Sequence, residues 1–396
     1  MTNFRVMVIG GGIGGLTLAH GLRRAGVAVE VYERTRQRSD WLQGYRIHIN
    51  PHGARALHEC LPPAGWRRFL DTAAAGGGFG FLTERGTELL GLSEAEINPR
   101  EGAPTDRHYA VSRILLRETL LDGLGDVVRH GRTFSQYTVS EDRVVAHFED
   151  GGTAEADLLV GADGANSRVR AQLLPRAHRQ DTGVVAIAGK HPLAGADLPP
   201  LLAGRANIVV PRGRGSLFTA PWPGEYVLWG FSDAADRLPP DVETLAGEAL
   251  QRLVEARLDG WAPAFRRLVA GSDPGTVNAF RVRSAAVVSP WPTGRVTLLG
   301  DAIHNMTPMA GIGANTALRD AALLCRRLAE GRPLPEAVGE YEREMLDYGF
   351  AAVRRSLRNA RGSATSTRAG RAAFRSVLRL TAATPPLRRA LARRLG

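Results

Sequence analysis

The segment from Phe4 to Glu33 constrains the fold most, because a glycine-rich turn separates a short apolar strand from an apolar helix. The strand contains Val6, Val8 and Ile9, and the turn reads Gly-Gly-Gly-Ile-Gly-Gly over residues 10–15. A second apolar strand follows the helix and ends at Glu33. This strand–helix–strand pattern predicts two parallel strands with a right-handed crossover, and therefore an α/β fold with a Rossmann-type domain.

The same glycines fit the spacing G-x-G-x-x-G. Gly10 allows the tight turn, Gly12 admits a pyrophosphate against the backbone, and Gly15 lets helix and strand approach. The first N–H groups of the helix then face the phosphates. Glu33 stands 21 residues after Gly12, where an acid accepts hydrogen bonds from a ribose diol. An acid favours an adenosine with a free 2′-hydroxyl, as in FAD or NAD. The predicted dinucleotide contacts here are Gly10, Gly12, Ile13, Gly14, Gly15, Glu33 and Arg34.

Two later segments separate FAD from NAD. Residues 158–168 form an apolar strand that runs into the turn Asp163-Gly164, and residues 295–304 form another strand that ends in Gly300-Asp301. A glycine-rich stretch and a predicted helix from about Ala314 to Glu330 follow. Glycines let a backbone approach a ring, and a helix N-terminus at 311–315 offers N–H donors and a positive dipole end to an anionic reduced flavin.

With these three motifs in order, the sequence resembles the single-component FAD-dependent aromatic hydroxylases of the para-hydroxybenzoate hydroxylase superfamily, over roughly residues 1–350. The resemblance implies noncovalent FAD, with NAD(P)H and O2 as co-substrates. It implies a flavin C4a-hydroperoxide that hydroxylates, or epoxidises, an apolar aromatic or polycyclic small molecule. It also implies a flavin that moves between an inward and an outward position, and Gly44 lies where that motion would be accommodated.

The resemblance assigns roles to particular residues. Asp163 and Gly164 would contact FAD and passing nicotinamide, Asp301 would accept hydrogen bonds from the ribityl chain, and Arg113 would contact the linker between the FAD halves. The flavin pyrimidine edge would be lined by Gly311, Gly313, Ala314 and Asn315. The candidate catalytic residues are Arg46, His48 and Pro308. The candidate substrate contacts are Phe218, Trp222, Trp229, Pro308 and Met309. His304 is expected to make a structural hydrogen bond in preference to a proton transfer.

The domain organisation follows from where the motifs stand. We expect a discontinuous FAD-binding domain over 1–75, 98–180 and 281–345, and a β-rich substrate domain over 76–97 and 181–280. In the latter, short alternating segments between Gly/Pro turns predict a mostly antiparallel sheet. Residues 346–396 form an Arg-rich helical segment, in which 362–370 are small and polar and predict a loop, and 386–395 predict a surface helix packed on its own body.

The charge distribution restricts the partners. The net charge is +11, but residues 351–396 contain twelve arginines and no acid, so that residues 1–350 sum to −1. Nucleic-acid binding is therefore not predicted. No apolar run is long enough for a membrane span, and the N-terminus does not read as a signal peptide. With only Cys60 and Cys325, no disulfide scaffold and no metal site is expected, and the cytoplasm is the default location. Monomer and homodimer both stay open.

Four alternatives compete with the monooxygenase. A reductase of the same superfamily would saturate double bonds, and oxygen consumption would distinguish it. A flavin halogenase is disfavoured, since no Trp-x-Trp-x-Ile-Pro segment occurs and the sole lysine, Lys190, is far from the flavin motifs. A flavin-binding regulator would need an effector module, for which the C-terminal segment is the candidate. A pure NAD-binding module leaves the Asp-Gly and Gly-Asp motifs unexplained.

Overall fold

The structure is a computed structural model that describes residues 4–36, 45–98, 102–365 and 367–395, with the backbone alone at 364, 365 and 393–395. The chain divides into two compact units. The first unit comprises Met1–Ala73, Arg113–Gln180 and Arg283–Ser356, and the second comprises Ala74–Ser112, Asp181–Val282 and Leu357–Gly396. Both units are therefore built from three separate stretches of sequence.

A five-stranded parallel sheet forms the centre of the first unit, in the order β18-β12-β1-β2-β8. Its core strand β1 is buried from Val6 to Ile9, which explains the near-continuous apolar sequence there. The predicted parallel pair joined by a helix is confirmed: β1 leads through α1 into β2. The strands are β1 (Arg5–Ile9), β2 (Ala28–Glu33), β8 (Val128–His130), β12 (Leu158–Gly161) and β18 (Val296–Leu298).

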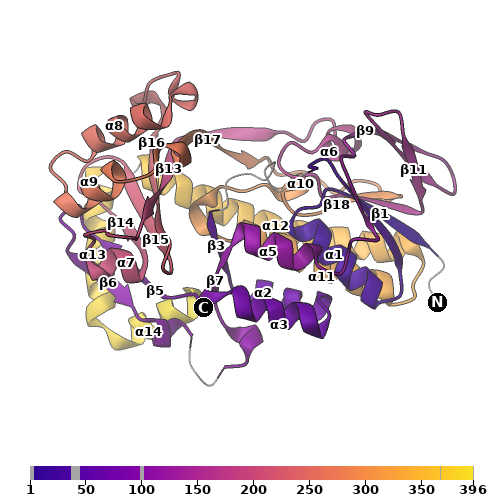
Figure 1. Ribbon diagram of the computed structural model, residues 1–396, viewed down its shortest axis with the longest axis horizontal. Helices are drawn as coiled ribbons and strands as arrows, with labels where there is room; N and C mark the ends of the chain where they lie inside the picture. Colours follow the sequence, from indigo (N-terminus) through magenta and orange to yellow (C-terminus); the bar gives the residue numbers. More distant parts are fainter. Residues whose placement is uncertain (1–3, 37–44, 99–101, 366, 396) are drawn as a thin grey trace. The chain divides into compact units, whose positions relative to one another are not determined.

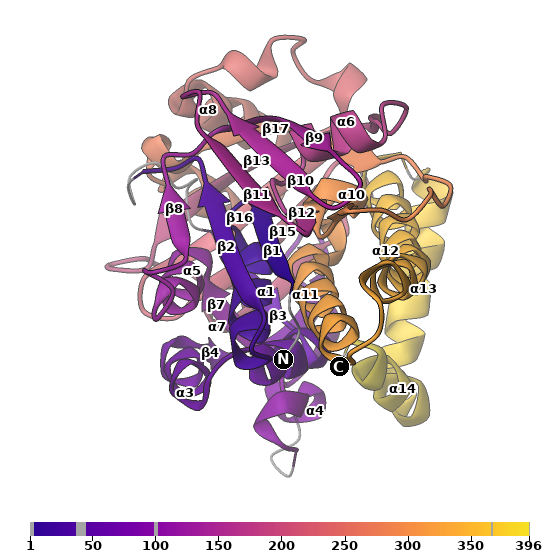
Figure 2. The same ribbon diagram turned by 90° about the vertical axis from the view of Figure 1, so that its right-hand side faces the viewer.

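Helices and a small antiparallel sheet complete this unit. Figure 2 shows α1 and α11 side by side, and α11 also packs on α2. The helices are α1 (Ile13–Arg24), α2 (Pro51–Cys60), α3 (Pro63–Thr72), α5 (Arg113–Leu121), α6 (Arg168–Leu173), α10 (Asp301–His304), α11 (Gly313–Ala329) and α12 (Leu334–Thr365), whose last residues belong to the second unit. The remaining elements are β3 (Arg46–Ile49), the antiparallel β9 (Phe134–Val139), β10 (Val144–Phe148) and β11 (Thr153–Ala156), and the 3-10 turn η6 (Pro308–Ala310).

A seven-stranded sheet, β17-β13-β16-β15-β14-β5-β6, organises the second unit (Figure 1). It is antiparallel at β13/β16, β16/β15, β15/β14 and β5/β6, and parallel at β14/β5, so the prediction of a mostly antiparallel sheet is confirmed. The strands are β5 (Gly78–Leu82), β6 (Glu88–Leu92), β13 (Arg179–Pro192), β14 (Arg205–Val209), β15 (Ser216–Trp222), β16 (Tyr226–Ala234) and β17 (Asn278–Ala285), with a separate antiparallel pair β4 (Ala74–Ala75) and β7 (Tyr109–Ser112).

One face of this sheet carries the apolar core of the second unit. Val227, Trp229 and Phe231 of β16 alternate inward and pack with Val254 and Phe265 of two helices. The helices of this unit are α4 (Glu94–Ile97), α7 (Pro200–Gly204), α8 (Gly247–Arg257), α9 (Pro263–Ala270), α13 (Arg368–Ala383) and α14 (Pro385–Leu395), with 3-10 turns η2 (Pro104–Asp106), η3 (Ala235–Arg237), η4 (Val242–Thr244) and η5 (Pro274–Thr276).

The predicted loop at 362–370 is wrong. Helix α12 continues to Thr365, and α13 begins at Arg368. The small polar residues terminate one helix and start the next: the Thr367 side chain caps α13 by accepting from the Gly370 N–H at 3.1 Å. Arg371 then donates to the Ser363 carbonyl at 2.8 Å. A short junction is therefore held by a cap and a buried guanidinium.

Part of the C-terminal arginine charge is used for packing within the second unit. Arg375 is buried and pairs with Glu84 at 2.8 Å, and Arg388 of α14 donates through Nε and Nη2 to the two oxygens of Glu96 at 2.6 and 2.8 Å. The prediction that α14 packs on its own body is confirmed by these contacts with α4. No helix in the described part of the chain is both long and apolar enough to cross a bilayer.

Candidate functional site

The glycine turn at 10–15 is close-packed everywhere except at Gly12. Gly10 has φ +113°, and a Cβ there would lie 2.4 Å from the Ala162 carbonyl oxygen. A Cβ on Gly15 would lie 2.1 Å from the Gly10 oxygen. Gly12 is different, because a Cβ there would meet no atom within 4 Å. Gly10 and Gly15 must be glycine because any side chain there would clash with the protein backbone. The open space at Gly12 suits a ligand that approaches the backbone.

Glu33 ends β2 directly beside this turn. Its Oε2 accepts from the Gly11 N–H at 2.6 Å, and its Oε1 accepts from the Thr35 N–H and hydroxyl at 2.8 and 2.9 Å. Glu33 is 8% exposed, and its Oε2, which accepts a single hydrogen bond, keeps acceptor capacity for a further donor such as a ribose hydroxyl. The predicted adenosine acid is therefore fixed against the glycine turn.

Sequence reasoning missed Arg117, which joins the same cluster from α5. Its Nε donates to the Gly11 carbonyl at 3.0 Å and its Nη2 donates to the Thr35 hydroxyl at 3.2 Å, while Nη2 lies 3.6 Å from Glu33 Oε2. Burial lowers the pKa of Arg117, which its proximity to Glu33 opposes. By contrast, the predicted contacts Arg34 and Arg113 have exposed side chains. Helical spacing from Arg113 would have pointed to Arg117, one turn further along α5.

Helices α1 and α11 both begin without a side-chain cap. Gly12 is the N-cap of α1 and Ile312 is the N-cap of α11. Neither residue has a side chain that could accept a hydrogen bond from the first turn. Their first N–H groups stay available to a ligand, with the positive ends of the helix dipoles behind them. The two helix starts belong to one region, because a Cβ on Gly14 would lie 2.6 Å from Leu299 and 3.3 Å from Ala317.

The Asp-Gly turn after β12 lies against the glycine turn, since a Cβ on Gly10 would also come within 2.9 Å of the Asp163 Cα. Asp163 Oδ2 accepts from the N–H groups of Arg168 and Val169 at 2.7 and 3.3 Å. Its Oδ1 is buried and accepts no hydrogen bond from any residue that the structure describes. Burial raises the pKa of Asp163. An unpaired buried acceptor beside a φ +80° glycine, Gly164, fits a missing ligand group.

The Gly-Asp motif and the glycine-rich stretch follow β18. Gly300 has φ +62°, and Asp301 begins α10 with an exposed carboxylate that accepts no hydrogen bond from the described residues. Gly311 is left-handed at φ +63° with open space around its Cβ position, and a Cβ on Gly313 would come no nearer than 3.7 Å to Met306. This backbone can therefore be approached closely from outside.

Arg170 is a second residue that sequence reasoning missed. It is buried on α6, and its Nη1 donates to the Ala302 carbonyl at 2.7 Å while its Nη2 donates to the Ala165 carbonyl at 3.0 Å. One guanidinium thus ties the Asp163 turn to α10. Arg168 and Arg170 stand two residues apart, and nothing in the sequence distinguishes the buried Arg170 from the exposed Arg168.

Asn315 holds backbone segments together. Its Oδ1 accepts from the Asn50 N–H at 2.8 Å, and its Nδ2 donates to the carbonyls of His48 and Gly311 at 2.8 and 3.3 Å. It is 2% exposed, so any flavin contact at this position would come from its backbone or from its neighbour Ala314. Asn315 therefore joins the start of α11 to the end of β3, the strand that carries Arg46 and His48, both half-buried.

The other predicted residues lie as follows. Pro308 is exposed and Met309 half-buried on η6. In the second unit, Phe218 is half-buried and Trp222 is buried with its Nε1 donating to Glu225 at 2.9 Å. Trp229 is fully buried in the core and donates to the Ser272 hydroxyl, and β alternation puts it on the opposite sheet face from Phe218. Gly44 falls outside the described residues.

The first unit therefore fits a dinucleotide flavin on structural grounds. It combines an open glycine turn, a ribose-type acid, a buried unpaired carboxylate oxygen and two uncapped helix starts, contributed by segments that are far apart in sequence. Among the described residues, no group of histidines, cysteines and acids is arranged to hold a metal ion.

Comparison with known proteins agrees with this geometry. Residues 3–356 match the FAD binding domain family. The 3-amino-4-hydroxybenzoate 2-monooxygenase PtmB3 of Streptomyces platensis is 32% identical, with 89% of this chain and 86% of that protein aligned. A putative FAD-containing monooxygenase of Photorhabdus luminescens superimposes with TM-score 0.83 at 38% identity, covering 91% of this chain and 98% of that one. Klebsiella pneumoniae HpxO complexed with FAD and uric acid gives TM-score 0.85 at 26% identity, covering 98% and 96%.

A further relative is longer than this chain. The dual O-methyltransferase/FAD-dependent monooxygenase elcB of Phaeosphaeria nodorum is 32% identical over 89% of this chain, but the chain spans 45% of its length. The chain belongs to the FAD binding domain family, in the para-hydroxybenzoate hydroxylase superfamily of FAD-dependent monooxygenases. The cofactor of this family is FAD.

Arg117 gives a first test of the adenosine end of the site. We expect Arg117→Met to weaken FAD binding about tenfold, because Gly11 and Glu33 lose a buried charged donor worth about 1.5–3 kcal/mol in a contact of this kind. Arg67→Met, an exposed arginine of α3 that no motif assigns to the cofactor, is the matched control. Titration of the apoproteins with FAD, followed by flavin fluorescence, measures both; equal affinities would remove Arg117 from the site.

Proposed function

We propose that this protein uses NAD(P)H and O2 to hydroxylate, or epoxidise, an apolar aromatic or polycyclic small molecule. The observation that carries the proposal is the meeting of three motifs in one unit, where the glycine turn, the Asp163 turn and the start of α11 are in contact range through Gly10, Gly14 and Ala317. Family membership and the oxygenase names of the relatives support the reaction class.

The residues of the first unit have separable tasks in this proposal. Glu33 accepts from the adenosine ribose, the N–H groups at the start of α1 bind the pyrophosphate, and Asp301 accepts from the ribityl hydroxyls. The N–H groups at Gly313 and Ala314 stabilise negative charge on the pyrimidine edge, which favours hydride acceptance. When bound, FAD supplies hydride acceptance and oxygen activation, and the protein supplies orientation and a dry site.

The residues predicted to contact substrate stay candidates, each within its own unit. On the first unit, Pro308, Met309, Arg46 and His48 stay candidates for contact with the flavin or the substrate. On the second unit, Phe218 and Trp222 share one face of β15 by alternation, so we confine the aromatic substrate contacts to these two and leave Trp229 in the core. Small aromatic acids and purines are suitable probes, because the relatives act on 3-amino-4-hydroxybenzoate and urate.

The deciding experiment measures flavin content and oxygen uptake together. The purified protein should be yellow and should release free FAD on denaturation. With a true substrate, NADH or NADPH oxidation should consume one O2 per NAD(P)H and yield a product heavier by one oxygen atom, which mass spectrometry detects with ¹⁸O2. Product formation without oxygen uptake would instead identify a double-bond reductase. Bound flavin without any substrate-dependent turnover would favour a flavin-binding regulator.

Substrate should also control the rate of the first half-reaction. We expect slow NAD(P)H oxidation in its absence and a marked increase in its presence, because the site must exclude water during oxygenation and still admit a bulky hydride donor. Anaerobic stopped-flow absorbance with and without substrate measures this. Identical rates would point to a constitutively open reductase.

The proposal places the protein in the cytoplasm, with monomer and homodimer both compatible.

A further inference from the structure

The carboxylate of Asp320, which has no assigned role, lies in contact with the Gly300-Asp301 motif. Asp320 of α11 is completely buried and accepts three hydrogen bonds, two from the Gly300–His304 segment and one from α12. Its Oδ2 accepts from the Gly300 N–H at 2.7 Å and from His304 Nε2 at 2.6 Å, and its Oδ1 accepts from the Tyr348 hydroxyl at 2.5 Å. A buried polar group needs hydrogen bonds to offset its loss of water, and Asp320 makes three.

The donors around Asp320 are held in their donating states. Burial by itself lowers the pKa of His304, but the charge and hydrogen bond of Asp320, together with the charge of Asp301, raise it above its ordinary value. Burial and the Asp320 charge raise the pKa of Tyr348, so the phenol keeps its proton. The His304 ring lies directly against α12, because a Cβ on Gly349 would come within 2.7 Å of it.

These bonds fix the backbone of the Gly-Asp motif. Gly300 adopts φ +62° and ψ −141°, which glycine reaches without steric cost, and because glycine is conformationally free its backbone is fixed by hydrogen bonds and not by sterics. Its N–H is held by Asp320, and its carbonyl accepts from the His304 N–H at 3.0 Å. The next residue is Asp301, whose carboxylate is free to meet a ligand. A shift of Gly300 would therefore move the Asp301 side chain directly.

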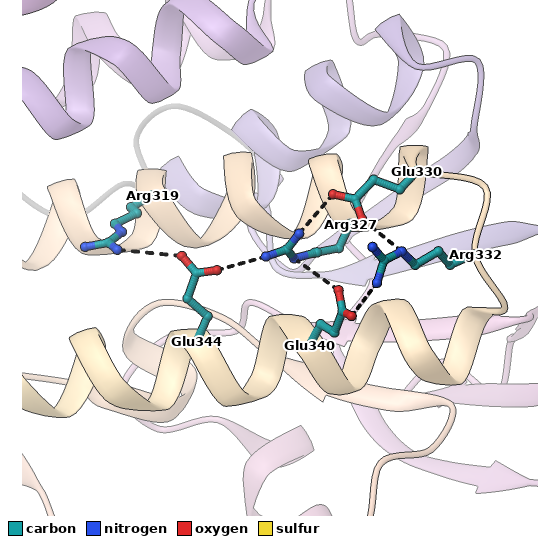
Figure 3. Close-up of polar contacts among 6 residues, drawn as sticks. All are labelled: Arg319, Arg327, Glu330, Arg332, Glu340 and Glu344. Atoms are coloured by element: carbon teal, nitrogen blue, oxygen red, sulfur yellow. Dashed lines mark hydrogen bonds and ion pairs between the residues drawn. The ribbon is translucent and has the colours of Figure 1, made fainter.

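A second layer of charges connects Asp320 to the surface of the same unit. The Arg319 guanidinium stacks 3.6 Å above the Tyr348 ring and lies 3.8 Å from Glu344. Figure 3 shows how Glu344 continues to Arg327, at 3.1 Å, within a network of six charged residues between α11 and α12. The network fixes these two helices against each other and so brings Tyr348 to Asp320.

We propose that Asp320, with its donors His304 and Tyr348, is a positioning group that sets the geometry of the Gly300–Asp301 segment toward FAD. This rests on the proposed function only in so far as Asp301 meets the ribityl chain. Asp320 itself touches neither cofactor nor substrate. The His304 ring is thereby committed to a carboxylate through its Nε2 and stays out of proton transfer to substrate.

The test is Asp320→Asn, which keeps the shape and removes the charge. An amide offers one acceptor oxygen where three donors now bond, so we expect FAD to bind at least tenfold more weakly. At saturating FAD, the midpoint potential of the bound flavin should differ from that of the wild type, because Asp301 and His304 have moved relative to it. Asp347→Asn, exposed on α12 and one residue from Tyr348, is the matched control and should change neither quantity.

A milder variant protects the test against misfolding. Tyr348→Phe keeps the ring under Arg319 and removes one hydroxyl, and it should weaken FAD binding several-fold while the apoprotein melts near the wild-type temperature. The proposal is overturned if both variants bind FAD with unchanged affinity and potential. It is also overturned if FAD affinity falls while the potential of the bound flavin is unchanged, because Asp320 would then be an ordinary core residue. Wild-type protein that takes up no FAD would instead remove the proposed function, which separates the two failures.

Discussion

Gly12→Val should abolish FAD binding and leave the folded apoprotein almost intact. A Cβ at Gly12 enters space that no protein atom occupies, and its backbone, at φ −82° and ψ −175°, suits any residue. Valine is a poorer N-cap than glycine, which costs the helix about 1 kcal/mol or less. The same side chain stands where a pyrophosphate must meet the first N–H groups of α1. Losing two charged hydrogen bonds of about 1.5–3 kcal/mol each corresponds to more than a hundredfold in affinity.

Two further glycines make this result interpretable. Gly125→Val places the same side chain in equally open space in the loop after α5, and it should leave FAD affinity unchanged. Gly15→Ala should behave in the opposite way, because its Cβ would clash with the Gly10 carbonyl and lower the melting temperature of the apoprotein itself. Thermal melts of the apoproteins and FAD titration distinguish the three. A Gly12→Val protein that binds FAD normally would show that the phosphates lie elsewhere.

The local motifs were predictable because each encodes its own backbone. The turn at 10–15, the left-handed Gly164 and Gly300 and the acid at Glu33 are all read from residue type and spacing, and the structure places the three glycine motifs together. The antiparallel sheet of the second unit was predictable from alternation for the same reason. These features depend on short-range sterics, which a single sequence states directly.

Contacts that depend on tertiary packing were not predictable. Arg170 and Asp320 act through partners that lie 132 and 20 residues away, and residue type and spacing gave no basis for choosing them. Trp229 was wrongly predicted for a related reason. Its aromatic side chain suggested a ligand contact, but its position in β16 directs the side chain toward the core. The 362–370 segment was predicted as a loop because the small polar residues at a helix junction, including the N-cap Thr367, have the same composition as a loop.

Asp301→Asn should reduce FAD affinity between tenfold and a hundredfold without destabilising the apoprotein. The carboxylate is exposed and accepts no hydrogen bond from the described residues, so the folded apoprotein loses no hydrogen bond to it. A ribityl hydroxyl that donates to a charged acceptor contributes about 1.5–3 kcal/mol, and an amide oxygen is a weaker acceptor. FAD titration of the apoprotein, with its melting temperature recorded alongside, measures both effects.

The size of this effect also separates two origins of cofactor affinity. If Asp301 binds the cofactor directly, Asp301→Asn loses affinity on its own, and combining it with Asp320→Asn adds little more, because Asp320 acts by positioning the carboxylate that has been removed. If the two losses add fully, Asp320 supports the site by another route. Asp142→Asn, an exposed acid on the turn between β9 and β10, controls for the change in net charge. Unchanged FAD affinity in Asp301→Asn would show that the Gly-Asp motif does not meet the ribityl chain.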